Sequence, residues 1–119
     1  MRQTEWAKLF PTKDSLQKVV SSFYQKLFND TMVSFLFANT NKEKLIQTQT
    51  DFLAKAFGIS QSYAGKPPAS AHTHLKILPG HFDRRLKILE ETLNESHLPK
   101  QAIDDWLKLE NSFRNKIIT

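Results

Sequence analysis

Hydrophobic residues recur at helical spacing along most of the chain. Between residues 12 and 29 they fall on one helical face, at Leu16, Val19, Val20, Phe23, Tyr24, Leu27 and Phe28. This period predicts an amphipathic helix. Thr12, Asp14 or Ser15 can cap its first turn, and Asn29 with Asp30 can end it.

Further helical segments follow this first one. We expect an apolar turn at 32–37 and a polar corner at 38–41, followed by a helix over 42–57 that stops at Gly58. After it come a loop at 60–70, a short helix carrying His72 and a turn at Pro79–Gly80. Two more helices are expected, one from Phe82 to Leu93 and one after Pro99 from Ile103 to Ile117. No repeat or long linker divides the sequence. The pattern predicts an all-α protein with one domain over residues 1–119.

The composition narrows the class of protein. Of the 119 residues 39% are hydrophobic, with nine Phe and two Trp, which is typical of a globular chain. The absence of cysteine excludes a disulfide framework, a thiolate nucleophile, thiolate-ligated haem, iron–sulfur clusters and the usual structural zinc sites. Any metal is therefore expected on His, Asp, Glu or a cofactor ring.

No targeting or membrane segment is expected. The first ten residues lack the apolar core of a signal peptide. No apolar run approaches the ~20 residues that a membrane-spanning helix needs. We therefore expect a soluble cytoplasmic protein with no membrane partner.

The net charge of +5 raises the alternative of a nucleic-acid-binding protein. Most Lys and Arg are spread thinly, as on solvated helix faces, and only Arg84, Arg85 and Lys87 form a cluster. Nucleic-acid modules usually gather basic charge on one face. A cofactor-free helical module that binds nucleic acid or a protein through this cluster remains the alternative hypothesis.

Two polar residues lie on the apolar faces of the first two long helices. Tyr24 and Gln49 would each point inward, where a phenol and especially an amide need hydrogen-bond partners. A buried amide without a partner costs about 1–3 kcal/mol. Either both residues lie hydrated at a boundary, or something polar faces them inside the protein.

His72 and His74, separated by one residue, are candidate metal ligands. Positions two apart lie on different faces of a helix, so a zinc site built from both is disfavoured. Taken alone, each is more often a surface or boundary histidine than a metal ligand, and the spacing by itself does not decide the question.

A resemblance to a known family connects these residues. Five segments, taken in order, resemble the truncated haemoglobins, most closely group I: FY (23–24), FLFANTN (35–41), KLIQTQTDFL (44–53), YAGKP (63–67) and AHTHLKI (71–77). The similarity extends from about Asp14 to the end of the sequence. The resemblance implies a 2-on-2 helical globin sandwich around one haem b (iron protoporphyrin IX). It also implies that His72, and not His74, is the proximal iron ligand.

The resemblance further assigns roles around the haem. Tyr24 and Gln49 correspond to the distal residues that stabilise a bound ligand. Lys44, with Lys66 as second choice, is the candidate partner of the haem propionates. The other residues expected to contact the haem are Phe37, Leu45, Thr48, Leu53, Tyr63, Ile77, Phe82 and Leu86.

The chain departs from the family pattern in places. Pro11 and Thr12 stand where a Gly-Gly pair usually separates the first two helices. Leu45, at the usual distal position, cannot donate a hydrogen bond, and Thr48 replaces a basic residue or histidine. We therefore expect a five-coordinate ferrous iron when no ligand is bound.

The function that the resemblance implies is reversible binding of O₂ and related diatomic ligands such as CO and NO. Consumption of NO through the O₂-bound form ranks first among the roles, ahead of O₂ storage, transport or sensing. This role needs a reductase that the sequence does not identify.

Overall fold

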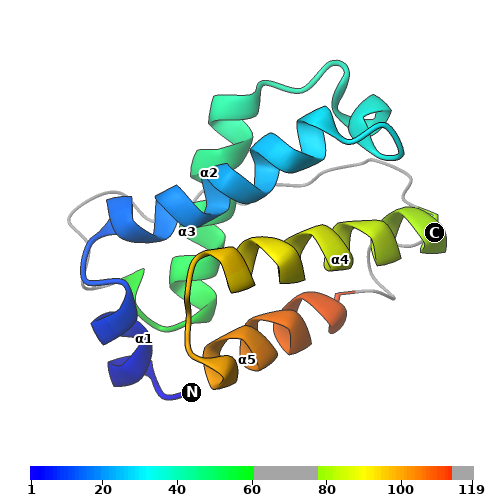
Figure 1. Cartoon of the computed structure of the whole chain (residues 1–119). Helices are drawn as coiled ribbons and strands as arrows, with labels where there is room; N and C mark the ends of the chain where they lie inside the picture. Colours follow the sequence, from blue (N-terminus) through cyan, green and yellow to red (C-terminus); the bar gives the residue numbers. More distant parts are fainter. Residues whose placement is uncertain (61–77, 114–119) are drawn as a thin grey trace.

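The computed structural model describes residues 1–60 and 78–113. Their regular structure is entirely helical: α1 (Gln3–Leu9), α2 (Lys13–Asn29), the 3-10 helix η1 (Ser34–Phe37), α3 (Lys42–Ala56), α4 (Pro79–Glu95) and α5 (Lys100–Asn111). In Figure 1, α2 crosses α3, and α4 and α5 run side by side in opposite directions. Because α2 also packs against α4, it connects the two pairs of helices. The expectation of an all-α fold is confirmed.

Local capping explains where α2 and α3 begin. The Thr12 side chain accepts a hydrogen bond from the Ser15 backbone N–H at 3.2 Å and so caps α2. Asn41 does the same for α3, where its Oδ1 accepts from the Lys44 N–H at 3.0 Å. Past the end of α3, Gly58 has a φ of 75°, a conformation that favours glycine. The predicted bounds of both helices are correct to within one residue.

The structure corrects the expected end of the last helix, which stops at Asn111 and not at Ile117, and two further expectations. Pro79 and Gly80, expected to form a turn, instead occupy the first turn of α4. Proline suits this position because its fixed φ matches the helix and its missing N–H would lack a helical partner. The last correction is α1, a helix of seven residues that the sequence pattern did not predict.

An aromatic cluster joins α1 to the end of α3 and the middle of α5. Trp6 stacks on Phe57, with ring centroids 3.8 Å apart and planes 8° from parallel. Trp106 meets the edge of Phe57 at 5.2 Å, and Phe10 approaches Trp106 at 6.1 Å. All four side chains are buried. A helix as short as α1 is only marginally stable in isolation, so this packing is what stabilises it.

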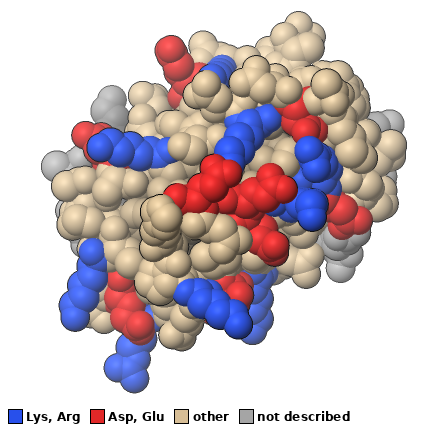
Figure 2. Space-filling model, viewed as in Figure 1, with Lys and Arg blue, Asp and Glu red and all other residues tan. Residues whose placement is uncertain are grey.

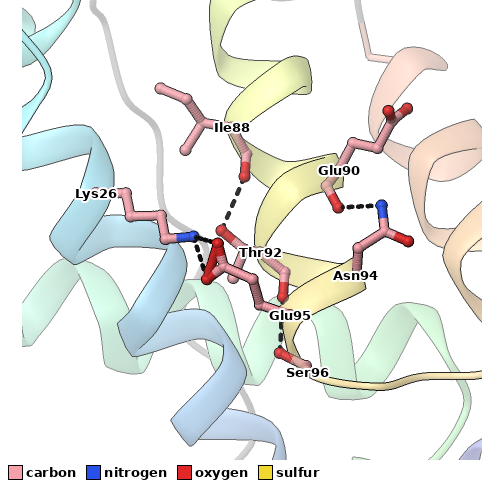
Figure 3. Close-up of polar contacts among 7 residues, drawn as sticks. All are labelled: Lys26, Ile88, Glu90, Thr92, Asn94, Glu95 and Ser96. Carbon is pink, nitrogen blue, oxygen red and sulfur yellow. Dashed lines mark hydrogen bonds and ion pairs between the residues drawn. The ribbon is translucent and has the colours of Figure 1, made fainter.

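Polar contacts fasten α2 to α4 at the end of the α4 helix. Lys26 of α2 donates to both carboxylate oxygens of Glu95 at 2.6 Å, as Figure 3 shows. Two hydroxyls, one in the last turns of α4 and one just after it, donate back to carbonyls one turn earlier: Thr92 to Ile88 and Ser96 to Thr92, both at 2.8 Å. Thr92 can therefore be buried without leaving its hydroxyl unpaired.

Candidate functional site

Tyr24 is the polar residue at the centre of the candidate site. It lies on α2 with only 4% of its surface exposed, so the boundary alternative is excluded for this residue. Phe23 packs beside its ring at 5.0 Å, and Phe37 of η1 meets it edge-on at 6.3 Å and 88°. These aromatic neighbours leave the phenol hydroxyl as the polar end of an otherwise apolar residue.

Phe37, expected to stack on a haem, is half-buried at the end of η1. Its ring also stacks on Phe28, with centroids 4.8 Å apart and planes 20° from parallel. Lys42 at the start of α3 lies over Phe28 at 5.9 Å. The corner between α2 and α3 is thus an aromatic surface with a cation at its rim.

The hydroxyl of Tyr24 has a charged partner that the sequence reasoning missed. Arg85 of α4 donates from Nη2 to the Tyr24 oxygen at 3.4 Å and from Nη1 to Glu110 Oε2 of α5 at 2.6 Å. Only 14% of the Arg85 side chain and 7% of the Glu110 side chain are exposed. The guanidinium also lies over the Phe23 ring at 5.0 Å. A buried ion pair and a phenol therefore join three helices.

A signal for this contact exists in the sequence. Glu110 lies seven residues after Ile103 and four after Trp106, which places a carboxylate on the apolar face of α5. A buried carboxylate needs a cation or several hydrogen-bond donors. That requirement calls for an inward-facing Arg or Lys on a neighbouring helix, and in the structure Arg85 meets it.

Burial and charge act in opposite directions on this group of residues. Burial raises the pKa of Tyr24 above its usual value, although the nearby Arg85 opposes this effect in part. Burial also works against the charge of Arg85, but Glu110 and Tyr24 more than compensate and raise its pKa above the usual value. At neutral pH the phenol is therefore protonated and the guanidinium charged.

The other expected site residues divide between α3 and α4. On α3, Leu45 and Leu53 are buried, Thr48 and Gln49 are half-buried, and Lys44 is exposed. On α4, Phe82 is fully buried and Leu86 is half-buried. The remaining candidates lie outside the described residues: Tyr63, Lys66, His72, His74 and Ile77.

The basic cluster of the alternative hypothesis is not a free cationic surface. Arg85 is buried against Glu110, and Arg84 donates to Asp30 Oδ1 from Nη2 at 2.7 Å and from Nε at 3.2 Å. Of the three residues, only Lys87 is exposed. On the face drawn in Figure 2, acidic side chains lie among the basic ones. The geometry does not support nucleic-acid binding through these residues.

The described side chains fit a haem in their chemistry. Apolar residues on three elements, Phe37, Leu45 and Phe82 among them, suit a flat apolar ring, and the buried hydroxyl of Tyr24 suits a polar ligand beside it. No helix within residues 1–60 and 78–113 has the length and apolar character needed to cross a membrane.

Comparisons with known proteins agree with this description. The family model of bacterial-like globins matches residues 11–119. A group 1 truncated hemoglobin of Tetrahymena thermophila is 34% identical over 80% of this chain and 78% of its own length. A second one, from Tetrahymena pyriformis, is 31% identical over 90% of this chain and 88% of its own length.

Solved structures show the same fold. The crystal structure of truncated hemoglobin from T. pyriformis in its Fe(III) form superposes with a TM-score of 0.73 at 28% identity, covering 88% of this chain and 90% of that one. The 2/2 hemoglobin from Synechococcus sp. PCC 7002 gives a TM-score of 0.67 at 23% identity, covering 86% of each chain. The fold is therefore the 2-on-2 globin sandwich.

The chain belongs to the bacterial-like globins and, within them, to the group 1 truncated haemoglobins. This membership supports haem-based binding of small ligands.

Proposed function

We propose that this globin binds one haem b and reversibly binds O₂ and related diatomic ligands. The observation that carries the proposal is the buried hydroxyl of Tyr24, whose oxygen accepts from Arg85. A phenol has one proton to donate. Because the oxygen serves Arg85, the proton is available to a ligand.

In this proposal His72 holds the haem iron, and the iron supplies the position at which a diatomic ligand binds. Phe37, Leu45 and Leu53 would contact the ring from η1 and α3, and Phe82 and Leu86 from α4. Tyr63 and Ile77 are the further residues assigned to this contact. Thr48 would face the haem edge and Lys44 the propionates, and the exposed position of Lys44 supports its assignment.

Tyr24 and Gln49 have the role of hydrogen-bond donors to the ligand. Bound O₂ develops negative charge on its outer atom, and donors fixed in a water-poor site stabilise such charge. CO develops much less charge and gains less. Gln49 is half-buried, so it can reach an interior ligand from the edge of α3.

Consumption of NO is the role that we place first for this site, ahead of O₂ storage, transport or sensing. Conversion of one NO and one O₂ to nitrate requires one electron, which the haem iron would supply. A one-electron reductase is then required to restore the ferrous state, and it is the protein partner that this role predicts. We propose that the protein acts in the cytoplasm.

The visible spectrum of the purified chain tests haem binding, and one substitution tests the assigned ligand. His72→Gly should lose haem, or retain it with a spectrum that added imidazole restores. His74→Gly is the matched control and should keep the unaltered spectrum. A chain without a Soret band after addition of haem would refute the function, whereas the reverse pattern of the two variants would refute only the assignment of His72.

The distal role is tested by the rate of ligand dissociation. A hydrogen bond to a charged acceptor is worth about 1.5–3 kcal/mol, and about 1.4 kcal/mol is tenfold in an equilibrium constant. Tyr24→Phe should therefore speed O₂ dissociation at least about tenfold and CO dissociation far less. Gln49→Leu and the double variant show whether the two donors act independently. Equal effects on both gases would leave Tyr24 as a packing residue.

A further inference from the structure

Arg85 is a charged residue in a position where packing alone requires none. The core around it is built from apolar side chains, and Phe23 lies directly against the guanidinium. A buried ion pair adds little net stability, because removing two charges from water costs about as much as their attraction returns. Arg85 and Glu110 are thus not explained by the stability of the fold.

The contacts of Arg85 suggest a different role. Its guanidinium is divided between two acceptors, the carboxylate of Glu110 at 2.6 Å and the phenol oxygen of Tyr24 at 3.4 Å. Glu110 fixes the position of the guanidinium, and the guanidinium occupies a lone pair of the phenol. The phenol proton must then point away from Arg85, because a guanidinium offers no acceptor.

We propose that Arg85, held by Glu110, is a positioning residue for Tyr24 and biases the ligand site toward ligands that carry negative charge. This inference rests on the proposed function, in which Tyr24 donates to the ligand. It adds a third residue to the two distal donors, and one that acts through Tyr24.

Charge makes the effect more than geometric. A hydrogen bond from a cation draws electron density from the phenol oxygen and makes its O–H a stronger donor. Glu110 opposes this polarisation, but it is the more distant charge, since Arg85 is the group that touches Tyr24. In agreement, Arg85 lowers the pKa of Tyr24 by more than Glu110 raises it, within the overall increase caused by burial.

Two variants of the haem-loaded protein should shift the site in opposite directions. Glu110→Gln keeps a hydrogen-bond acceptor for Arg85 but removes the opposing charge, so O₂ dissociation should slow by about threefold. The double variant Arg85→Met with Glu110→Met removes the pair without leaving one charge alone. It should speed O₂ dissociation by about tenfold, equivalent to about 1.4 kcal/mol. CO dissociation should change little in both.

Two spectroscopic measurements read the same effect without ligand kinetics. A more positive site lowers the C–O stretching frequency of the CO complex, so this frequency should fall in Glu110→Gln and rise in the double variant. The second measurement is the NMR signal of tyrosine labelled with ¹³C at Cζ. The chain has two tyrosines, and the signal that is missing from Tyr24→Phe belongs to Tyr24. Its titration midpoint in the CO complex should fall in Glu110→Gln and rise in the double variant.

The outcomes separate the inference from the function on which it rests. Arg84→Met alters a neighbouring arginine that pairs with Asp30 and should leave all three readouts unchanged. Opposite shifts in the two test variants support the positioning role. Shifts of both in the same direction, or none, overturn it while Tyr24→Phe still speeds O₂ dissociation. A Tyr24→Phe variant with unaltered O₂ dissociation overturns the distal role of Tyr24 itself, and the inference falls with it.

Discussion

The buried group of Arg85, Glu110 and Tyr24 predicts an unusual order of stabilities. Arg85→Met leaves the carboxylate of Glu110 and the hydroxyl of Tyr24 buried without their partner. Removing one member of a buried ion pair costs about 3–5 kcal/mol. This is a large share of the total stability of about 5–15 kcal/mol that domains possess.

Further substitutions should restore stability. Adding Glu110→Met removes the unpaired charge and leaves only the Tyr24 hydroxyl, whose lost hydrogen bond costs about 1–3 kcal/mol. Adding Tyr24→Phe removes this group too. The triple variant should then return close to the wild type, because apolar residues of similar volume often replace a buried ion pair without loss.

The free energy of unfolding of each variant is measured by urea unfolding, followed by far-UV circular dichroism. Every variant receives the same excess of haem, because haem binding itself stabilises the folded state. The slope of the unfolding free energy against urea should stay constant, so that shifts in midpoint report stability. Arg84→Met is the matched control and should cost much less than Arg85→Met, since its ion pair is partly exposed. Losses that grow with each added substitution would refute the coupling of the three groups.

Three further predictions concern other parts of the fold. Gly58→Ala should destabilise the protein by about 1–3 kcal/mol in thermal unfolding, because a side chain is strained at a φ of 75°. Trp6→Ala should cost about 3–5 kcal/mol in urea unfolding through the loss of a fully packed aromatic side chain. The hydrogen bond from Arg84, more than any other effect, lowers the pKa of Asp30 below the usual 3.8. The ion pair therefore stabilises the folded state fully above the unfolded pKa of Asp30, and this stabilisation is lost as the pH falls through the lower pKa of the folded state. The free energies of unfolding of the wild type and Arg84→Met should thus differ at pH 7 and converge in acid.

Apolar periods, with the cap at Thr12 for α2 and the stop at Gly58 for α3, were sufficient to predict both helices. Each combines a long apolar face with a side chain that caps its first turn, Thr12 in one case and Asn41 in the other. They were not sufficient for α1, whose seven residues offer too short a pattern. The stacking of Trp6 on Phe57 stabilises α1, and a contact between residues so far apart in the chain leaves no local signal.

The candidate site was predictable only in part, for a similar reason. The helical period was enough to place Tyr24 inside, and its burial is confirmed. The same period could not identify its partner, because Arg84 and Arg85 look like one basic cluster in the sequence although adjacent helix positions point in different directions. Arg85 turns inward to Glu110, 25 residues further along the chain. Whether His72 holds the iron stays a prediction, since it lies outside the described residues.

The aromatic cluster around α1 has an optical consequence. The chain has two tryptophans, and both belong to this cluster, with ring centroids 6.4 Å apart. Both indoles are almost fully shielded, with 4% and 1% of their surfaces exposed. The wavelength of the intrinsic fluorescence therefore reports whether water enters at this one end of the molecule. If its unfolding midpoint came before that of the helical signal, α1 would detach while the other helices stayed folded.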